Sequence, residues 1–201
     1  MRWFRRRLLN PVRWVAIDCE TSGLDMERDR LLSVGAVAVR CGRIELADSF
    51  DAYVQQATPS AIQNILLHGI GGDAQRAGRP AAAVIAALSE YIGDGVPVGF
   101  HAPFDDAILR RHGLKLDEAW LDLATLLPAL FPQRGRAGTL NDWLEHFAIR
   151  SHARHDALGD AFAATQLLLI VLAEAKRQRV DTVEGLFKAE RARRWLAPQG
   201  G

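Results

Sequence analysis

The sequence lacks the features that define several whole classes of protein. It has two cysteines, Cys19 and Cys41, which are too few for a disulfide framework and do not have the paired spacing of a zinc site. Apolar runs such as Leu167–Ala173 are far shorter than the roughly 18 residues that a membrane-spanning helix needs. Scarce cysteine is typical of a reducing compartment, so we expect a cytoplasmic protein that does not enter the membrane.

An excess of charge of one sign is also lacking. The formal net charge is +1, from 25 basic and 24 acidic residues. Residues 1–14 contain five arginines and no acid, so the remaining chain has a formal charge of −4. A protein that binds nucleic acid by charge alone has a basic body, and this chain does not. An acidic body is compatible with nucleic acid only where cations neutralise the acids locally.

The rest of the composition is that of an ordinary globular domain. Hydrophobic residues make up 49% and charged residues 24% of 201 residues, which predicts one domain with a sizeable core. Apolar runs predict antiparallel strands over Val12–Cys19, Leu31–Arg40 and Arg43–Tyr53. The later segments are expected as the helix Ala61–His68, the loop Gly69–Gly78, the helix Pro80–Ile92, the strand Val96–Phe100, the helix Pro103–His112, the strand Trp120–Ala124 and the helices Thr139–Phe147, Asp156–Arg177 and Thr182–Trp195. This order predicts an α/β fold with a mixed sheet covered by helices.

Two acidic residues stand at the end of the first predicted strand. Strand side chains alternate between two faces, so Asp18 and Glu20 point to the same face and Cys19 points to the other, into packing. Like charges side by side on a sheet repel each other and need a cation between them. The alternative is that the strand ends at Ile17 and both acids are ordinary turn residues.

Two further acids and a histidine fall near predicted helix starts. Asp105 lies in the first turn of the helix that Pro103 opens, where helix-dipole or capping chemistry is the simpler interpretation. Asp160 lies among alanines in the long helix and faces either solvent or a site. His155 faces the same site only if it stands at or before the first turn, with Asp156 as N-cap. Otherwise His155 is a surface histidine.

Together these residues have one chemical use. Four carboxylates from three separate segments supply hard oxygen ligands, which suit Mg²⁺ or Mn²⁺ better than zinc. Two such ions about 3.5–4 Å apart are the usual arrangement for phosphoryl displacement by water. A neutral histidine near pH 7 can take the proton of that water. The set therefore predicts metal-dependent phosphoryl hydrolysis on a polyanion.

Three ordered motifs resemble those of the DEDDh, or DnaQ-like, 3′–5′ exonuclease family over roughly Trp14 to Leu172. VAIDCETSGL is similar to D-x-E-T-T/S-G-L, GFHAPFD to H-N-A-x-F-D, and HDALGDA to H-x-A-x-x-D-A. Each motif alone is weak, but their order and spacing make the set specific. A histidine rather than a tyrosine in the third motif selects the DEDDh branch.

The resemblance implies a fold and a domain organisation. The fold is ribonuclease H-like, with three layers in α/β/α order around a mixed five-stranded sheet. Residues 12–178 would form the exonuclease domain, residues 1–11 a basic arm and residues 179–201 a flanking helix with a basic tail. The arm is either solvated or contacts phosphate or a membrane surface. Candidate contacts to a nucleic-acid backbone are Arg5, Arg6, Arg7, Arg191, Arg193 and Arg194.

The resemblance also implies an activity. Asp18, Glu20, Asp105 and Asp160 would bind two Mg²⁺ or Mn²⁺ ions, and His155 would be the general base. The reaction would release nucleoside 5′-monophosphates from the 3′ end of single-stranded nucleic acid, with DNA favoured over RNA.

Residues beside the motifs are expected to hold the terminal nucleotide. By resemblance, these are Thr21, Leu24, His68, Phe104 and His101. Leu24 would wedge beside the terminal base and His68 would approach the sugar, and turn or core packing is the alternative role. His101 stands where the family usually has asparagine, which would alter how the substrate is oriented. Asp122 matches a recurrent aspartate of the family, for which a supporting or structural role is expected.

Three functions remain open from the sequence. The first is an active exonuclease of the proofreading or repair type, either alone or as a DNA polymerase subunit. The second is a module that binds a polymerase without catalysis. The third is an RNA-trimming exonuclease, which would recognise the 2′-hydroxyl. The presence of all five active-site residues favours catalysis, because a binding module has no chemical use for clustered carboxylates.

Overall fold

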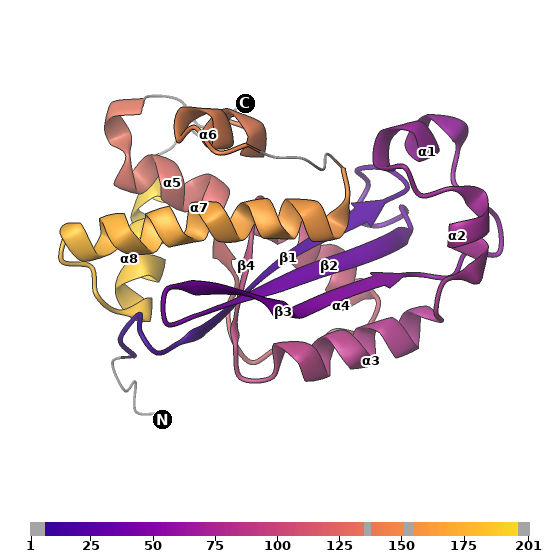
Figure 1. Ribbon diagram of the computed structural model, residues 1–201, viewed down its shortest axis with the longest axis horizontal. Coiled ribbons are helices and arrows are strands. Elements are labelled where there is room, and N and C mark those ends of the chain that lie inside the picture. The colour runs from indigo at the N-terminus through magenta and orange to yellow at the C-terminus, as the bar shows by residue number, and fades with distance from the viewer. Residues whose placement is uncertain (1–6, 135–137, 151–154, 197–201) are drawn as a thin grey trace.

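The computed structural model describes residues 7–134, 138–150 and 155–196, which form a mixed five-stranded sheet with helices on both faces (Figure 1). The strand order is β3-β2-β1-β4-β5. The predicted α/β fold with a mixed five-stranded sheet between two helical layers is therefore confirmed. The middle strand, β1, is the one that carries Asp18 and Glu20.

The strands β1 (Arg13–Thr21), β2 (Leu31–Arg40) and β3 (Arg43–Tyr53) form the predicted antiparallel meander. Two short strands, β4 (Val96–Gly99) and β5 (Leu121–Asp122), extend the sheet in the direction parallel to β1. β1 therefore runs two residues beyond its predicted end, and both Asp18 and Glu20 lie within the strand.

The helical segments surround this sheet. They are α1 (Ile62–His68), α2 (Gly72–Ala77), α3 (Ala81–Ile92), α4 (Ala102–Arg111), α5 (Leu123–Leu130), the 3₁₀ helix η1 (Pro132–Arg134), α6 (Leu140–His146), α7 (Ala157–Arg177) and α8 (Val183–Leu196). α7 lies across β1 and β2 on one face, with α5 beside it and α8 packed on α5, while α3 and α4 cover the other face (Figure 1).

Alternate side chains of β1 enter two separate cores. Trp14 and Ala16 are buried with residues of α5 and α7, whereas Ile17 is buried with residues of α3 and α4. The same alternation places Asp18 on the α7 face and Cys19 on the α4 face, where Cys19 is buried. The predicted orientation of Cys19 into packing is therefore confirmed.

Two predicted segments were wrong. The expected loop Gly69–Gly78 contains α2, because the buried side chain of Gln75 holds that helix through hydrogen bonds to the Ser60 hydroxyl and the Ile70 carbonyl, both at 2.9 Å. The expected strand Trp120–Ala124 keeps only Leu121–Asp122, because Asp122 caps α5 through the Ala124 N–H. An apolar helix buried on most sides has no clear period, and α5 was therefore missed.

α7 is long and apolar enough, by length and composition alone, to cross a membrane, although its apolar residues do not form one uninterrupted run. The core helix of a globular protein passes the same test. In this fold α7 packs along β1 and β2, and nine of its residues are buried.

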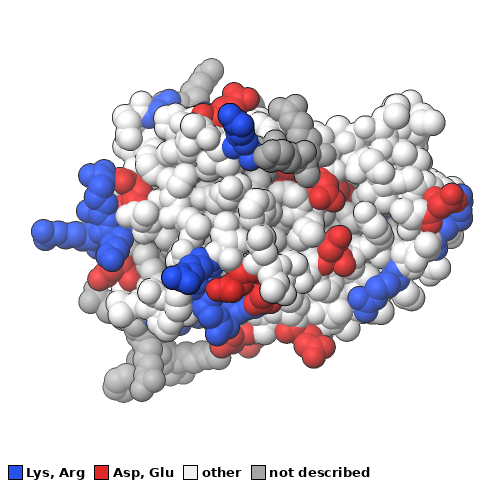
Figure 2. Space-filling view, in the orientation of Figure 1, with Lys and Arg blue, Asp and Glu red and all other residues white. Residues whose placement is uncertain are grey.

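The charged arms predicted at the two ends are only partly described. Arg2, Arg5 and Arg6 and the side chain of Arg194 lie outside the described residues. Arg7 pairs with Glu118 at 2.8 Å, and its backbone carbonyl accepts a hydrogen bond from the start of α8. In Figure 2, basic side chains gather at the edge where α7 ends, and both basic and acidic side chains are scattered over the rest of this face.

Candidate active site

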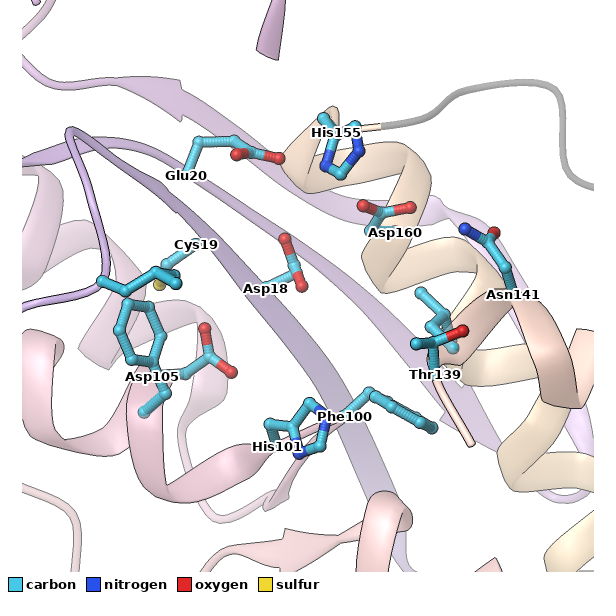
Figure 3. Close-up of a pocket in the computed structure, with 13 residues that line it drawn as sticks. Asp18, Cys19, Glu20, Phe100, His101, Asp105, Thr139, Asn141, His155 and Asp160 are labelled. Carbon is cyan, nitrogen blue, oxygen red and sulfur yellow. The ribbon is translucent and has the colours of Figure 1, made fainter. Parts of the chain in front are cut away.

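A cavity of about 630 Å³ lies where the end of β1 meets the starts of α4, α6 and α7 (Figure 3). Its lining includes all five predicted catalytic residues, Asp18, Glu20, Asp105, His155 and Asp160. Residues from three segments far apart in the sequence are thus brought to one place, as the motifs predicted.

β1 presents Asp18 and Glu20 toward α7. Both lie in the strand and pair with β2, so the interpretation as turn residues is wrong. Gly35 of β2 is the partner of Asp18 in this register. A Cβ atom at Gly35 would lie 2.2 Å from the backbone carbon of Ala157 and 2.2 Å from the backbone nitrogen of Leu158. Glycine there lets the start of α7 approach the sheet beside Asp18.

The start of α7 carries the third motif. Asp156 caps the helix, and its side chain accepts a hydrogen bond from the Gly159 backbone N–H at 3.0 Å. His155 precedes this cap with a φ of 55°, so it stands before the first turn, as a shared site requires. Glu20, His155 and Asp160 each offer one ligand atom, and these atoms lie within 4.8 Å of one another.

The turn between β4 and α4 places Asp105. The buried carboxylate of Asp122 accepts the backbone N–H groups of His101 at 3.0 Å and Ala102 at 3.2 Å, and its second oxygen accepts the Thr125 hydroxyl at 2.6 Å. These bonds fix the turn, and Asp105 projects from the first turn of α4 with only 3% of its surface exposed. Asp122 therefore has the structural role that was expected.

Burial raises the pKa of three carboxylates of this site, and neighbouring charges add to the shift at Asp18 and Glu20. Burial, followed by the charges of Asp105 and Asp160, raises the pKa of Asp18 well above its ordinary value. Burial, followed by the charge of Asp160, raises the pKa of Glu20 to about 7. Burial also raises the pKa of Asp105, although hydrogen bonds with Cys19 oppose that shift.

This group of side chains fits divalent cations. Among the residues that the structure describes, no lysine or arginine forms an ion pair with Asp18, Glu20 or Asp105. Like charges gathered without a basic partner are stable in ionised form only when a cation lies between them. The donors are oxygens with one imidazole beside them, which favours Mg²⁺ or Mn²⁺.

The predicted substrate residues divide into two groups. Leu24, Phe104 and His101 line the cavity, and Leu24 is 87% exposed, as a wedge between bases would be. His101 has a φ of 67°, in the left-handed region where asparagine and histidine are both enriched, so histidine fits the position. Thr21 and His68 are not among the lining residues: the Thr21 hydroxyl donates to a nearby backbone carbonyl, and His68 is buried.

Several lining residues were not predicted. They are Cys19, Phe100, Thr139, Leu140 and Asn141. The three residues at the start of α6 follow a Gly/Arg loop and belong to an ordinary amphipathic helix, so their types carry no signal of a site. Only the folded arrangement shows that this helix start faces the carboxylates.

The fold is that of solved exonucleases. Exonuclease X in complex with 5′-overhanging duplex DNA has a TM-score of 0.71 at 21% identity, and the match covers 89% of this chain and 99% of that chain. E. coli exonuclease I in complex with a dT13 oligonucleotide has a TM-score of 0.69 at 19% identity, with 83% and 42% covered. These likenesses establish a ribonuclease H-like exonuclease fold.

The sequence relatives define the family. The family model described as exonuclease (RNase T) matches residues 15–168, and the chain belongs to this family of DnaQ-like exonucleases. The PolC-type DNA polymerase III of Bacillus subtilis (strain 168) is 31% identical over 181 residues. A DNA polymerase III subunit epsilon-like protein of Rhodobacter capsulatus is 32% identical over 184 residues. Both matches cover 87% of this chain but only 12% and 26% of the relatives' own lengths.

Proposed function

We propose that this chain is a 3′–5′ exonuclease that releases nucleoside 5′-monophosphates from a single-stranded 3′ end with two Mg²⁺ or Mn²⁺ ions. The convergence of four carboxylates and His155 in one cavity carries this proposal. Membership of the exonuclease family supports it. The relatives named for DNA polymerase III favour DNA as the substrate and a polymerase as a partner.

Each group in the site has a distinct task. Asp18, Glu20, Asp105 and Asp160 hold the cations, which when bound would neutralise the carboxylates and polarise the scissile phosphate. His155 is exposed in front of α7, so one of its ring nitrogens takes the proton from the attacking water. The oxygen of that water attacks the phosphorus of the scissile phosphate, and the 3′-oxygen of the preceding nucleotide leaves.

The terminal nucleotide is assigned to the side of the cavity that holds Leu24 and Phe104. Phe104 precedes Asp105 in α4, and its ring is available for packing against a sugar or base. Leu24 belongs to the turn after β1 and is mostly exposed, so it can separate the last base from its neighbour. A substrate whose end is already unpaired enters such a site without the cost of unstacking a duplex.

Two adjacent acids of α4 give a matched test of the site. Asp105 is buried at the cavity, whereas Asp106 pairs with Arg110 at 2.6 Å. With a 5′-labelled single-stranded oligodeoxynucleotide and Mg²⁺ or Mn²⁺, Asp105→Asn should lower kcat by about 10³-fold or more, because metal-ion stabilisation is worth several kcal/mol. Asp106→Asn should stay within about twofold of the wild type.

The reaction products show the direction of degradation, and the rates on DNA and RNA show the class of substrate. We expect nucleoside 5′-monophosphates and a ladder that shortens from the 3′ end, only while a divalent cation is present. DNA should be degraded faster than RNA, and frayed ends faster than paired ends. Full activity of Asp105→Asn would refute the site, and faster degradation of RNA would move the proposal to RNA trimming.

A further inference from the structure

Asp18 and Asp160 stand in the middle of the cavity rather than at one end of it. Figure 3 shows Asp18 and Asp160 between two walls. Cys19 and Asp105 lie on one side, and Thr139 and Asn141, at the start of α6, lie on the other. A phosphodiester centred on Asp18 and Asp160 therefore has one nucleotide against each wall.

Asn141 is held rigidly on the second wall. It is the second residue of α6, and that helix begins with a capping box: the Asp142 N–H donates to the Thr139 hydroxyl at 3.2 Å, and the Thr139 N–H donates to the Asp142 carboxylate at 2.7 Å. Behind the cap, the same helix is anchored by Trp143 and Leu144, which are buried in the core. The position of Asn141 is therefore set by the core and not by a loop.

The carboxamide of Asn141 points into the cavity toward Asp160 (Figure 3). It forms no hydrogen bond to any other residue in the part of the chain that the structure describes. An amide offers two N–H donors without a charge. At this place in the cavity, such donors suit a phosphate oxygen better than they suit water alone, because hydrogen bonds to charged groups are about twice as strong as neutral ones.

We infer that Asn141 donates a hydrogen bond to a phosphate oxygen of the retained strand, and so forms a subsite for the nucleotide on the leaving side of the scissile bond. This inference rests on the proposed function, in which Leu24 and Phe104 hold the nucleotide that is released. Every nucleotide of the strand presents the same phosphate, so this contact positions the substrate without reading its sequence.

Two substrates separate the subsite from the chemistry. A single-stranded oligodeoxynucleotide has a nucleotide on both sides of the scissile bond. The p-nitrophenyl ester of thymidine 5′-monophosphate has a nucleotide only on the released side, with p-nitrophenolate as the leaving group. With Asn141→Ala, kcat/KM on the oligonucleotide should fall by about tenfold, as expected for one hydrogen bond to a charged group. The loss on the ester should be at least fivefold smaller.

A second variant, Asn141→Asp, separates the loss of the hydrogen bond from a loss of activity that is caused by misfolding. Aspartate has the same shape, and its favourable interaction with the first turn of a helix works against the added repulsion from Asp160, so the variant should still fold, which its melting temperature checks. It removes the donors and places a negative charge beside the phosphate, so the loss on the oligonucleotide should exceed that of Asn141→Ala. Glu145→Ala, an exposed change on the same helix, is the matched control.

A binding measurement gives a readout that does not depend on turnover. With Ca²⁺ in place of Mg²⁺, a 5′-fluorescein oligodeoxynucleotide should bind Asn141→Asp about tenfold or more weakly than the wild type. Equal losses on oligonucleotide and ester, or no loss on either, would overturn the subsite. If the wild type hydrolysed neither substrate with Mg²⁺ or Mn²⁺, the proposed function would fail, and the binding comparison alone would then decide on Asn141.

Discussion

The charged side chains at the two ends of β1 have opposite surroundings. At its start, the Arg13 guanidinium donates to the Asp48 carboxylate at 2.9 Å and to the carbonyls of Tyr91 and Ile92 at 2.9 and 3.1 Å. It also lies 4.8 Å from the centroid of the Tyr91 ring. At the other end, burial raises the pKa of Asp18, and the carboxylates of its own sign that it faces raise it further. One strand thus carries a satisfied charge at its start and a repulsive cluster near its end.

This difference separates structure from function. The Arg13 end joins β1, β3 and the end of α3, so its bonds stabilise the fold. The carboxylate end opposes folding as long as its charges are not neutralised, because buried like charges raise the free energy of the folded chain. Sites that lower stability in return for activity are common in enzymes. Substitutions at the two ends should therefore have opposite effects on stability and on activity.

The largest expected effect is at the carboxylate end. Asp18→Asn removes one charge from the cluster without changing the shape of the side chain. We expect kcat to fall by about 10³-fold or more and the melting temperature of the metal-free protein to stay unchanged or to rise. Calorimetry and the oligonucleotide assay measure both quantities on one preparation. A clear loss of stability in the metal-free protein would contradict the comparison.

Gly35→Ala should impair both properties, because it acts on packing beside the same site. The new Cβ atom would stand 2.2 Å from the backbone of Ala157, so the start of α7 must move away from the sheet. We expect a loss of about 3 kcal/mol in the free energy of unfolding, at the upper end for overpacking. We also expect a drop in kcat of about 10²-fold, because displacing catalytic groups by about 1 Å has that effect. Gly71→Ala is a matched control, since nothing lies within 4 Å of its Cβ position and its φ of −62° is one that alanine adopts without strain.

The opposite pattern is expected at the start of the strand. Arg13→Met leaves Asp48 and two carbonyls without their donor, and the Arg13 side chain is only 11% exposed. The free energy of unfolding should fall by about 2–3 kcal/mol, because the Asp48 carboxylate and two carbonyls lose a donor that is itself mostly buried. The kcat/KM of the folded enzyme should remain near that of the wild type. Urea denaturation and the oligonucleotide assay test this, and a hundredfold loss of activity in folded protein would refute the separation.

The carboxylate end could be predicted because its signals are local. The period of two in a strand places Asp18 and Glu20 on one face and Cys19 on the other, and the cap at Asp156 places His155 before its helix. The motif order then indicates that these segments meet. Short-range geometry of this kind depends on a few neighbouring residues, which the sequence shows directly.

The remaining parts depend on contacts between distant segments. The need for glycine at position 35 comes from the approach of α7, which lies far along the chain. The role of Asn141 comes from the packing of α6 beside the cavity, and the residue type alone does not indicate that role. α5 was missed because burial on most of its sides removes the amphipathic period. In each case the deciding neighbour is remote in the sequence.

The smallest expected effect is a pH dependence confined to the carboxylate end. The pKa of Glu20 is raised in the folded protein to about 7, so folding favours its protonated form. The stability that this provides is fully present below the ordinary pKa of the side chain, near 4.5, and is lost as the pH rises through about 7. In EDTA, the free energy of unfolding should therefore fall between pH 5 and pH 8, by about 1–2 kcal/mol after allowance for partial exposure.

Added metal should reverse this trend. Mn²⁺ binds ionised carboxylates, so its stabilisation should grow over the same pH range, and the melting temperatures with and without metal should diverge. Glu20→Gln should make the curve in EDTA less steep, and the remaining slope comes from Asp18 and Asp105, whose pKa values burial also raises. Arg13→Met should lower the curve by a constant amount, because arginine keeps its charge throughout this range. A melting temperature that rises with pH in EDTA would show that the acidic cluster does not oppose folding, and the contrast between the two ends of β1 would then disappear.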